Sequence, residues 1–134
     1  MSDQDPKEVV RRLFQAFNDR QFDRLEGTVF SPALVYRHNG READLKRWIR
    51  DSGDCIASFP DAQMIPEEQI ESGDRVTTRF RFRGTQPGPG GRDVPGGKKF
   101  DVAGSAISRI MDGLIVEETE QVDEKALGRQ LGLD

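Results

Sequence analysis

The stretch LIVEETEQVD, from Leu114 to Asp123, carries more polar side chains than a strand over a dry core needs. Successive side chains of a strand point to opposite faces. One face would carry Ile115, Glu117, Thr119, Gln121 and Asp123, and the other would carry Leu114, Val116, Glu118, Glu120 and Val122. Neither face is purely apolar. Carboxylates, an amide and a hydroxyl beside apolar residues are typical of a face that lines a wet cavity.

Asp123 and His38 have side chains of types that can transfer protons. A carboxyl group in apolar surroundings can act as base and then as acid, and histidine is the side-chain type that ordinarily titrates near neutral pH. Each residue also has a plainer interpretation. Asp123 stands in VDEKALGRQLG, where it fits the N-cap of a C-terminal helical turn. His38 precedes Asn39-Gly40, a turn sequence, and would then lie at an exposed strand end.

The usual metal ligands are scarce in this chain. With one cysteine, Cys55, and one histidine, it lacks the ligands of an ordinary zinc site. The carboxylates show no EF-hand spacing, and no phosphate-binding loop motif occurs. We therefore expect metal-independent chemistry, or none. Cys55 is expected to be a core thiol rather than a nucleophile, because no second histidine is present to activate it.

Length and charge are those of one globular domain spanning residues 1–134. The net charge is −4, and basic residues are interspersed among acidic ones, which argues against nucleic-acid binding. The sequence contains no apolar run of ~18 residues, so no membrane span is predicted. Its N-terminus lacks the layout of a signal peptide. One cysteine forms no intrachain disulfide, so a cytoplasmic protein is expected.

Helical and strand-like patterns follow one another in a definite order. Asp5-Pro6 is typical of a helix start, Pro32 is expected to end the second helix, and Gly and Pro concentrate at 87–99, which predicts a flexible loop. The predicted helices span 6–20, 22–27 and 41–58, and the predicted strands span 33–38, 62–70, 75–85, 100–110 and 114–123. This order predicts an α+β fold with three N-terminal helices on one face of a curved sheet.

The strand at 75–85 separates two kinds of side chain. One face carries Val76, Thr78, Phe80, Phe82 and Gly84, and the other carries Thr77, Arg79, Arg81, Arg83 and Thr85. The phenylalanine face is expected to be the core. The arginines fit either an anion-binding patch or ion pairs across neighbouring strands, and we expect ion pairs, with Glu117, Glu118 or Glu120.

Several of these pieces together resemble the SnoaL-like polyketide cyclases, in the larger nuclear-transport-factor-2-like group. The resemblance rests on VVRRLFQAFNDRQFDRL, a histidine at the end of the first strand, FPD closing the third helix, ESGDRV followed by RFRGT, and ISRIMDGLIVEE followed by VD and RQLG. It implies a cone-shaped fold in which a strongly curved, mostly antiparallel sheet encloses a pocket. It also implies homodimers that pair through the sheet face, and aldol ring closure without metal or cofactor.

The same resemblance assigns roles to residues of the pocket. Asp123 matches the acid at the end of the family's last strand, so the face bearing Thr119, Gln121 and Asp123 is expected to turn inward. His38 is the second expected proton-transfer residue. The residues expected to contact the substrate are Tyr36, Gln86, Thr119, Gln121, Phe80, Phe82, Trp48 and Ala106. Tyr36 and Trp48 are aromatic residues of a kind that more often belongs to the core, and for Trp48, on the apolar stripe of a helix, the core is the favoured interpretation.

Three positions depart from the family pattern. Gln86 stands where relatives often have histidine, Ala106 where they often have aspartate or histidine, and Thr119 where they usually have tryptophan. The expected function is binding of a small hydrophobic carbonyl compound, with acid/base chemistry of the aldol-cyclisation type. The departures favour a second hypothesis, a non-catalytic ligand-binding or dimeric interaction module. An isomerase, dehydratase or epoxide hydrolase on the same fold is a third.

Overall fold

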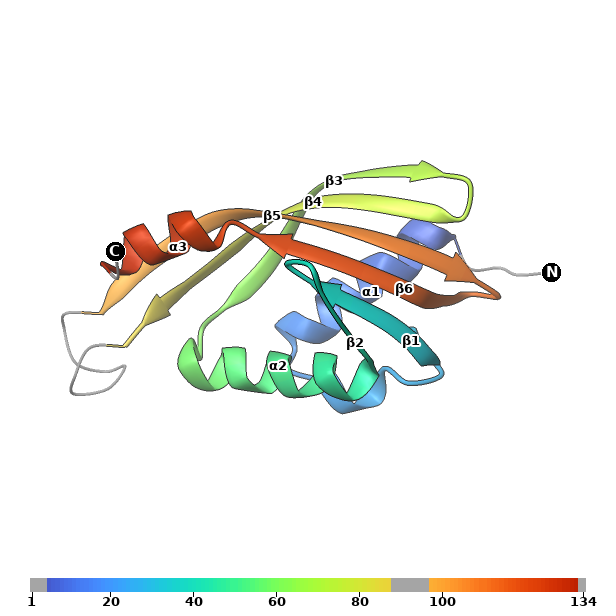
Figure 1. Cartoon of the computed structure of the whole chain (residues 1–134), viewed down its shortest axis with the longest axis horizontal. Helices are drawn as coiled ribbons and strands as arrows, with labels where there is room; N and C mark the ends of the chain where they lie inside the picture. Colours follow the sequence, from blue (N-terminus) through green and yellow to red (C-terminus); the bar gives the residue numbers. More distant parts are fainter. Residues whose placement is uncertain (1–4, 88–96, 133–134) are drawn as a thin grey trace.

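The structure, a computed structural model, describes residues 5–87 and 97–132 (Figure 1). In chain order its elements are α1 (Pro6–Asn18), the 3₁₀ turn η1 (Phe22–Arg24), β1 (Phe30–His38), β2 (Arg41–Ala43), α2 (Leu45–Ser58), β3 (Gln63–Ser72), β4 (Arg75–Gln86), β5 (Lys98–Met111), β6 (Leu114–Val122) and α3 (Glu124–Leu131). The strands form one six-stranded sheet in the order β2-β1-β6-β5-β4-β3. Neighbours are antiparallel except β1 and β6, which run parallel.

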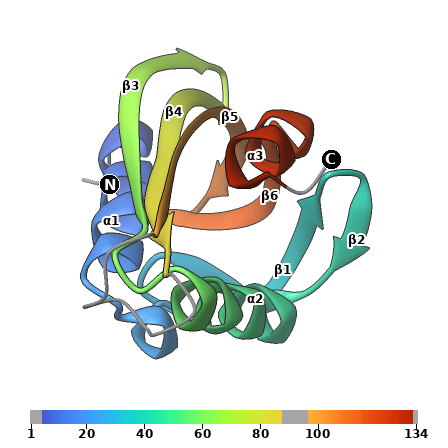
Figure 2. The same ribbon diagram turned by 90° about the vertical axis from the view of Figure 1, so that its left-hand side faces the viewer.

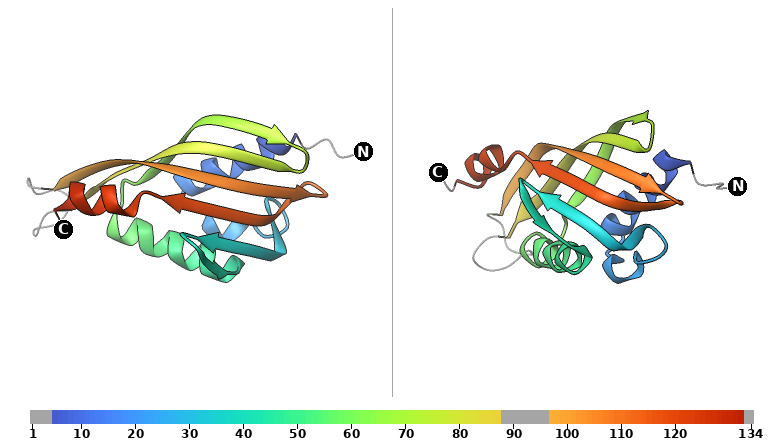
Figure 3. Two further views of the ribbon diagram at one scale, coloured as in Figure 1. Left: turned by 45° about the horizontal axis from the view of Figure 1, so that its top comes forward. Right: turned by 45° about the vertical axis from the view of Figure 1, so that its right-hand side comes forward.

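The sheet curves around its helices. Figure 2 shows it bending from β3 round to β1 and β2, with α1 and α2 against the inner face, and Figure 3 shows β5 and β6 side by side along the molecule. The C-terminal helix α3 is fixed beside β5, where the Asp101 N–H donates to Gln130 Oε1 at 2.7 Å and Lys98 Nζ donates to the Leu131 carbonyl at 3.1 Å. No helix among the described residues is long and apolar enough to cross a membrane.

The α+β class and the curved sheet are confirmed, but the placement of the helices differs from the expectation. The second predicted helix is a single turn, η1, without a side-chain cap. The start of the third predicted helix is strand β2, because Asn39 (φ 48°) and Gly40 (φ 85°) adopt the left-handed conformations of a tight hairpin turn. Asp44 then caps α2. The third α-helix is therefore α3, at the C-terminal end of the described chain.

Two further boundaries differ from the expectation. Pro32 does not end a helix; it lies inside β1, where the pairing with β6 shifts register between Phe30 and Val35. Such an irregularity tolerates a residue without an N–H donor. The expected flexible loop at 87–99 lies mostly outside the described residues, and its last two residues, Lys98 and Lys99, belong to β5.

Aromatic side chains fill the space between the helices and the inner face. Phe80 on β4 packs edge-on against Phe14 of α1, with ring centroids 5.3 Å apart. Gly104 on β5 makes room for that ring, since a Cβ there would lie 2.5 Å from Phe80 Cζ. Trp48 of α2 is 1% exposed and packs against Phe30 of β1 at 5.0 Å. The phenylalanine face of β4 is thus part of the core, as expected.

A β-bulge in β6 decides which side chains face inward. Arg109 of β5 pairs with Glu117, but the next residue, Ile110, pairs with Ile115, so Val116 is an extra residue. Beyond the bulge the alternation is inverted: Glu118 and Glu120 are buried, whereas Thr119 is half-buried and Gln121 exposed on the outer face. The bulge breaks the regular alternation that starts at Ile115, so the expectation that Thr119 and Gln121 face the pocket is wrong.

The arginines of β4 lie on the outer face and form ion pairs, as expected, but with other partners. Arg79 lies near Glu67 and Glu68, at 3.9 and 3.6 Å. Arg81 and Arg83 share Asp101 of β5, at 2.8 and 3.1 Å. The three expected partners on β6 do not pair with them, because two of those glutamates point inward and Glu117 pairs with Arg109 instead.

Candidate active-site cavity

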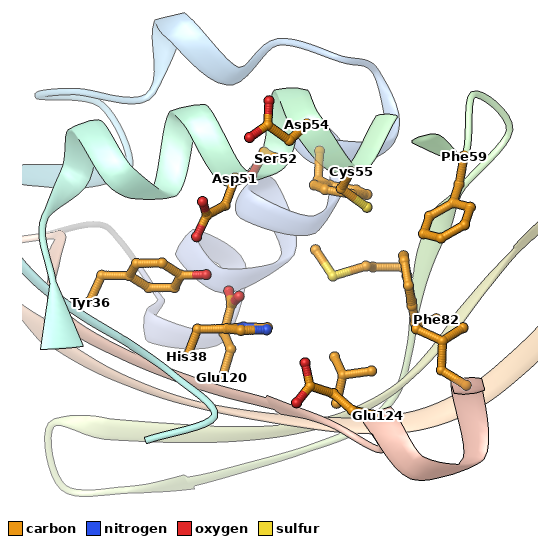
Figure 4. A pocket seen from close by; sticks show the side chains of 14 residues that line it. Tyr36, His38, Asp51, Ser52, Asp54, Cys55, Phe59, Phe82, Glu120 and Glu124 are labelled. Atoms are coloured by element: carbon orange, nitrogen blue, oxygen red, sulfur yellow. The ribbon is translucent and has the colours of Figure 1, made fainter. Parts of the chain in front are cut away.

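A cavity of about 260 Å³ opens between the inner face of the sheet, α2 and α3 (Figure 4). Its wall is aromatic and aliphatic on one side and polar on the other. The residues that line it are Phe17, Tyr36, His38, Asp51, Ser52, Asp54, Cys55, Phe59, Met64, Phe82, Glu120, Val122, Glu124 and Leu127. Strand β6 contributes Glu120 and Val122 to this wall, from the face opposite to the one predicted, and several other helices and strands contribute the rest.

The polar wall is organised by the pairing of three neighbouring strands. Tyr36 of β1 lies beside Glu118 of β6, and His38 lies beside Glu120. On the other side, Ser108 and Ala106 of β5 pair with the same two glutamates. Because in-register side chains on one face of a sheet are close neighbours, the sheet places two carboxyl groups between a phenol and an imidazole on one side and a hydroxyl on the other.

Asn39 fixes the end of this arrangement. Its side-chain Oδ1 accepts from the Val122 N–H at 3.1 Å, and its own backbone N–H donates to the Glu120 carbonyl at 3.0 Å. Both bonds join the end of β1 to the end of β6. His38 and Glu120 are therefore held beside each other by the hydrogen bonds that Asn39, the residue after His38, makes with Glu120 and Val122.

Glu118 and Glu120 are buried carboxyl groups, with 0% and 8% of their surfaces exposed. Ser108 Oγ donates to Glu118 Oε1, and Trp48 Nε1 lies 3.4 Å from Glu120 Oε2. Burial, and then the charge of Glu120, raises the pKa of Glu118 well above its ordinary range. Burial also raises the pKa of Glu120, although a hydrogen bond from Glu118, the His38 charge and Trp48 act in the opposite direction.

Tyr36 and His38 extend from β1 toward Glu120 and Asp51 (Figure 4). Burial, followed by the nearby acidic groups, raises the pKa of Tyr36 above its ordinary 10, so its hydroxyl remains protonated and can donate a hydrogen bond. His38 Nδ1 is buried without a hydrogen-bond partner among the described residues. The cavity thus offers one phenolic donor, and an imidazole nitrogen that a bound molecule can satisfy.

Helix α2 supplies the opposite wall with Asp51, Ser52, Asp54 and Cys55. Asp51 pairs with Arg47 one turn earlier, at 3.2 Å. Burial raises the pKa of the Cys55 thiol to about 11, which keeps it protonated at neutral pH. A protonated thiol is a poor nucleophile, in agreement with the expectation that Cys55 is not one. Cys55 is half-buried on the cavity wall rather than a core residue. No group of three or more His, Cys, Asp or Glu side chains in the described ranges is arranged to hold a metal ion.

The structure brings together three of the residues expected at the site: Tyr36, His38 and Phe82 all line the cavity. Asp123 does not. Its Oδ1 accepts from the Ala126 N–H at 2.9 Å and caps α3, and the residue is exposed. The alternative of an N-cap is thus confirmed, and the expected inward orientation of Asp123 is wrong because the bulge and the start of α3 turn it outward.

The other expected contact residues lie elsewhere. Phe80, Trp48 and Ala106 are each 1% exposed and belong to the core behind the cavity, where Trp48 contacts Glu120. Gln86 is the last residue of β4 and does not line the cavity. The two outward-facing residues are Thr119 and Gln121.

Glu120 is the most consequential residue that the expectation missed. It lies on the strand face that regular alternation from Ile115 assigns away from the pocket, and the bulge turns it inward. One signal in the sequence points to it: if Asp123 caps a helix whose apolar residues include Leu127 and Leu131, Val122 has to face inward, and Glu120 then shares its face. The α2 residues of the wall carry no comparable signal, because they fit an ordinary solvated helix face.

Comparison with known proteins agrees with this geometry. The family described as SnoaL-like polyketide cyclase matches residues 7–131. IdmH from Streptomyces antibioticus, a proposed polyketide cyclase, is 27% identical and superimposes with a TM-score of 0.85 over 96% of this chain and 99% of its own. AclR from Streptomyces galilaeus, a proposed hydroxylase, is 21% identical, with a TM-score of 0.81 over 96% of this chain and 85% of its own.

A proposed SnoaL-like polyketide cyclase from Jannaschia sp. CCS1 is 22% identical, with a TM-score of 0.79 over 100% of this chain and 99% of its own. At these identities the AclR and Jannaschia structures support the fold alone. No curated protein matches the sequence significantly.

Proposed function

Because the chain belongs to the SnoaL-like polyketide cyclase family, we propose that its cavity binds a small, mostly apolar carbonyl compound and moves a proton at the carbon next to that carbonyl. The observation that carries this proposal is Glu120, a buried carboxyl group with a raised pKa on the cavity wall. A carboxylate that burial has made more basic is suited to take a proton from carbon and to return it to oxygen.

The neighbours of Glu120 fit the remaining parts of such a reaction. The Tyr36 hydroxyl keeps its proton and can donate to the carbonyl oxygen as negative charge develops there. His38 can donate or accept a second hydrogen bond from the same wall. In an aldol cyclisation, Glu120 takes the proton from carbon, the resulting enolate carbon attacks a second carbonyl carbon, and the proton on Glu120 passes to the new alkoxide oxygen.

The dimensions of the cavity restrict the compound. About 260 Å³ is slightly below the ~300–1,000 Å³ of drug-sized pockets, so the space fits a compound of about two fused rings. The apolar side of the wall, with Phe59, Phe82 and Met64, suits the hydrocarbon part of that compound, and the polar side suits its oxygens.

We test this with α-proton exchange, which needs no knowledge of the natural substrate. The probe is 1-tetralone, a bicyclic aromatic ketone, incubated with the protein in D₂O while ¹H NMR follows loss of its α-proton signal. Saturable exchange above the buffer rate is expected, and Glu120→Gln is expected to lower it by roughly 100-fold or more. Glu117→Gln is the matched control, because Glu117 lies on the same strand but faces outward and pairs with Arg109.

The possible results separate the two main hypotheses. Binding of 1-tetralone, seen as chemical-shift changes at Val122 and Leu127, without catalysed exchange would refute proton transfer and support a ligand-binding module. Equal exchange by the wild type and Glu120→Gln would remove Glu120 from the mechanism. No binding at all would refute the assignment of the ligand class.

We further propose that the protein forms homodimers through the outer face of the sheet. Ile107 and Met111 of β5 are 44% and 47% exposed there, and Thr119 pairs beside Ile107 on the same face. Exposed apolar residues on a sheet face are suited to an interface. Light scattering tests this: Ile107→Glu is expected to shift a wild-type dimer to monomer, and a monomeric wild type would refute the proposal.

A further inference from the structure

We propose that Glu118 and Glu120 hold one proton between them at neutral pH, with Glu118 as the protonated partner that positions Glu120. Glu118 does not line the cavity, so it acts through its neighbour and is a positioning residue rather than a catalytic one. Only this positioning part rests on the proposed function. The shared proton is a property of the free protein and can be measured without any substrate.

The geometry of β6 places the two carboxyl groups next to each other on one buried face of the strand. They are two residues apart on the same strand, beyond the bulge, and both face inward. Side chains at that spacing lie on one face of a strand. Neighbouring strands close the space on both sides, with Tyr36 and Ser108 beside Glu118 and His38 and Ala106 beside Glu120.

The charges around the pair do not offset two carboxylates. Strand β1 contributes His38 and the Tyr36 hydroxyl, and that hydroxyl is neutral. Helix α2 contributes Trp48, Asp51 and Arg47, and Arg47 is already paired with Asp51. Within the described segments, the charged groups that act on the two carboxyls are the glutamates themselves and His38. Two like charges close together in a buried site cannot both persist, so one proton remains on the pair.

The surroundings also decide which partner is protonated. Glu118 is the deeper of the two, with 0% of its surface exposed, and the donor to its Oε1 is the neutral hydroxyl of Ser108. Glu120 is closer to the cavity, near Trp48 Nε1 and His38, both of which favour its charged form. Glu118 Oε2 is buried without a hydrogen-bond partner among the described residues, so it is the oxygen left to carry the proton. A protonated Glu118 agrees with its raised pKa, and a charged Glu120 agrees with the contributions of Glu118, His38 and Trp48, which lower the pKa of Glu120 against the effect of burial.

This arrangement gives Glu120 a defined role in the proposed reaction. In the resting protein Glu120 is the charged oxygen acceptor, held in place by the proton of Glu118. When Glu120 takes a proton from carbon, both carboxyl groups become neutral, and when it returns that proton to the alkoxide, the resting pair is restored. The proton of Glu118 stays on the pair throughout, so no external acid is needed.

Infrared spectroscopy of the free protein tests the shared proton. A protonated carboxylic acid has a C=O stretching band that is separate from the carboxylate and amide bands. At pH 7 the wild type is expected to show one such band, with the intensity of a single group. Glu118→Gln is expected to lose the band, because Glu120 is then charged, whereas Glu120→Gln and the outward-facing control Glu117→Gln are expected to keep it.

Any of the following infrared results would overturn the proposal. No band in the wild type means that both groups are charged, and a band of double intensity that persists in Glu118→Gln means that both are protonated. A band that is lost in Glu120→Gln but kept in Glu118→Gln places the proton on the wrong residue. The wild-type spectrum decides the number of protons even if a variant fails to fold.

Exchange of 1-tetralone then tests the positioning role separately. The amide introduced by Glu118→Gln can donate to Glu120 as the protonated acid does, so this variant is expected to retain exchange within severalfold of wild type. Glu118→Met removes the donor, so the pH at which exchange reaches half its maximum is expected to move upward. An unchanged pH profile in Glu118→Met would refute positioning by Glu118. If no variant, including wild type, exchanges the probe while the infrared result holds, the proposed function fails and the shared proton stands.

Discussion

Replacing Glu118 by Gln is expected to change how the stability of the protein depends on pH. Burial raises the pKa of Glu118 in the folded protein above the ordinary value of 4.5. In the unfolded chain the same group is in water and titrates near that ordinary value. Between the two pKa values the folded protein therefore binds one proton more than the unfolded chain. The free energy of unfolding accordingly decreases as the pH rises through this interval.

The magnitude follows from that one proton. Each pH unit within the interval lowers the free energy of unfolding by ~1.4 kcal/mol. Glu118→Gln removes this contribution, because the amide does not titrate, while it keeps a group that can accept from Ser108 and donate to Glu120. At pH 4 the two proteins are expected to differ by about 1 kcal/mol or less. The variant then gains on the wild type by ~1.4 kcal/mol per pH unit until the folded pKa is passed.

Urea unfolding followed by circular dichroism between pH 4 and 8 measures this difference. Glu117→Gln is the control, since Glu117 faces outward and its partial exposure limits any change to a few tenths of a kcal/mol. If the curves of the wild type and Glu118→Gln run parallel from pH 4 to 8, Glu118 titrates normally and the inference of a buried protonated acid is wrong. A wild type that gains stability relative to the variant as pH rises would reverse the sign.

Three other experiments have defined outcomes. Asp123→Ala removes the cap on the Ala126 N–H and is expected to lower the free energy of unfolding in urea by ~1 kcal/mol without lowering 1-tetralone exchange. Asp123→Ser is expected to keep most of the stability. Loss of exchange in Asp123→Ala would restore Asp123 as a catalytic candidate. Cys55, with a pKa of about 11, is expected to react with iodoacetamide at pH 8 roughly 100-fold more slowly than a free thiol, and the rate should rise about tenfold per pH unit; a flat rate would contradict the raised pKa. Asn39→Gly keeps the left-handed turn but loses the hydrogen bond from the Val122 N–H, so it is expected to lower the free energy of unfolding by ~1 kcal/mol. Asn39→Ala is expected to lower it further, because φ at this position is 48°. Equal losses in urea unfolding would mean that the turn conformation is unimportant.

Local signals in the sequence predict the parts of the fold that local chemistry determines. Asp5 followed by Pro6 caps α1 as expected, and Asp123 caps α3 in agreement with its plainer interpretation. The Asn39-Gly40 pair predicts a turn, but the pattern after it suggests a helix where β2 lies, because three residues carry too little periodicity to distinguish the two.

Pairing between neighbouring strands, and not the local sequence, determines which carboxylates of β6 face inward. Regular alternation from Ile115 places Thr119 and Gln121 inward, and nothing in the letters around Val116 announces a bulge. The pairing of Arg109 with Glu117 determines it, and that pairing depends on β5 already being in register with β4. Tyr36 and His38 share the face that alternation predicts, because β1 is regular from Val35 onward.

The extra residue at Val116 also makes this strand tolerant of changes in chain length at one position. A chain lacking Val116 can pair continuously and still present Ile115, Glu118 and Glu120 on the same side. A chain lacking Thr119 instead moves Glu120 to the outside and replaces it with Gln121. Natural variation in length is therefore expected to accumulate at the bulge. A single-residue deletion two or three positions further along would exchange the groups that β6 contributes to the cavity, Glu120 and Val122, in one evolutionary step.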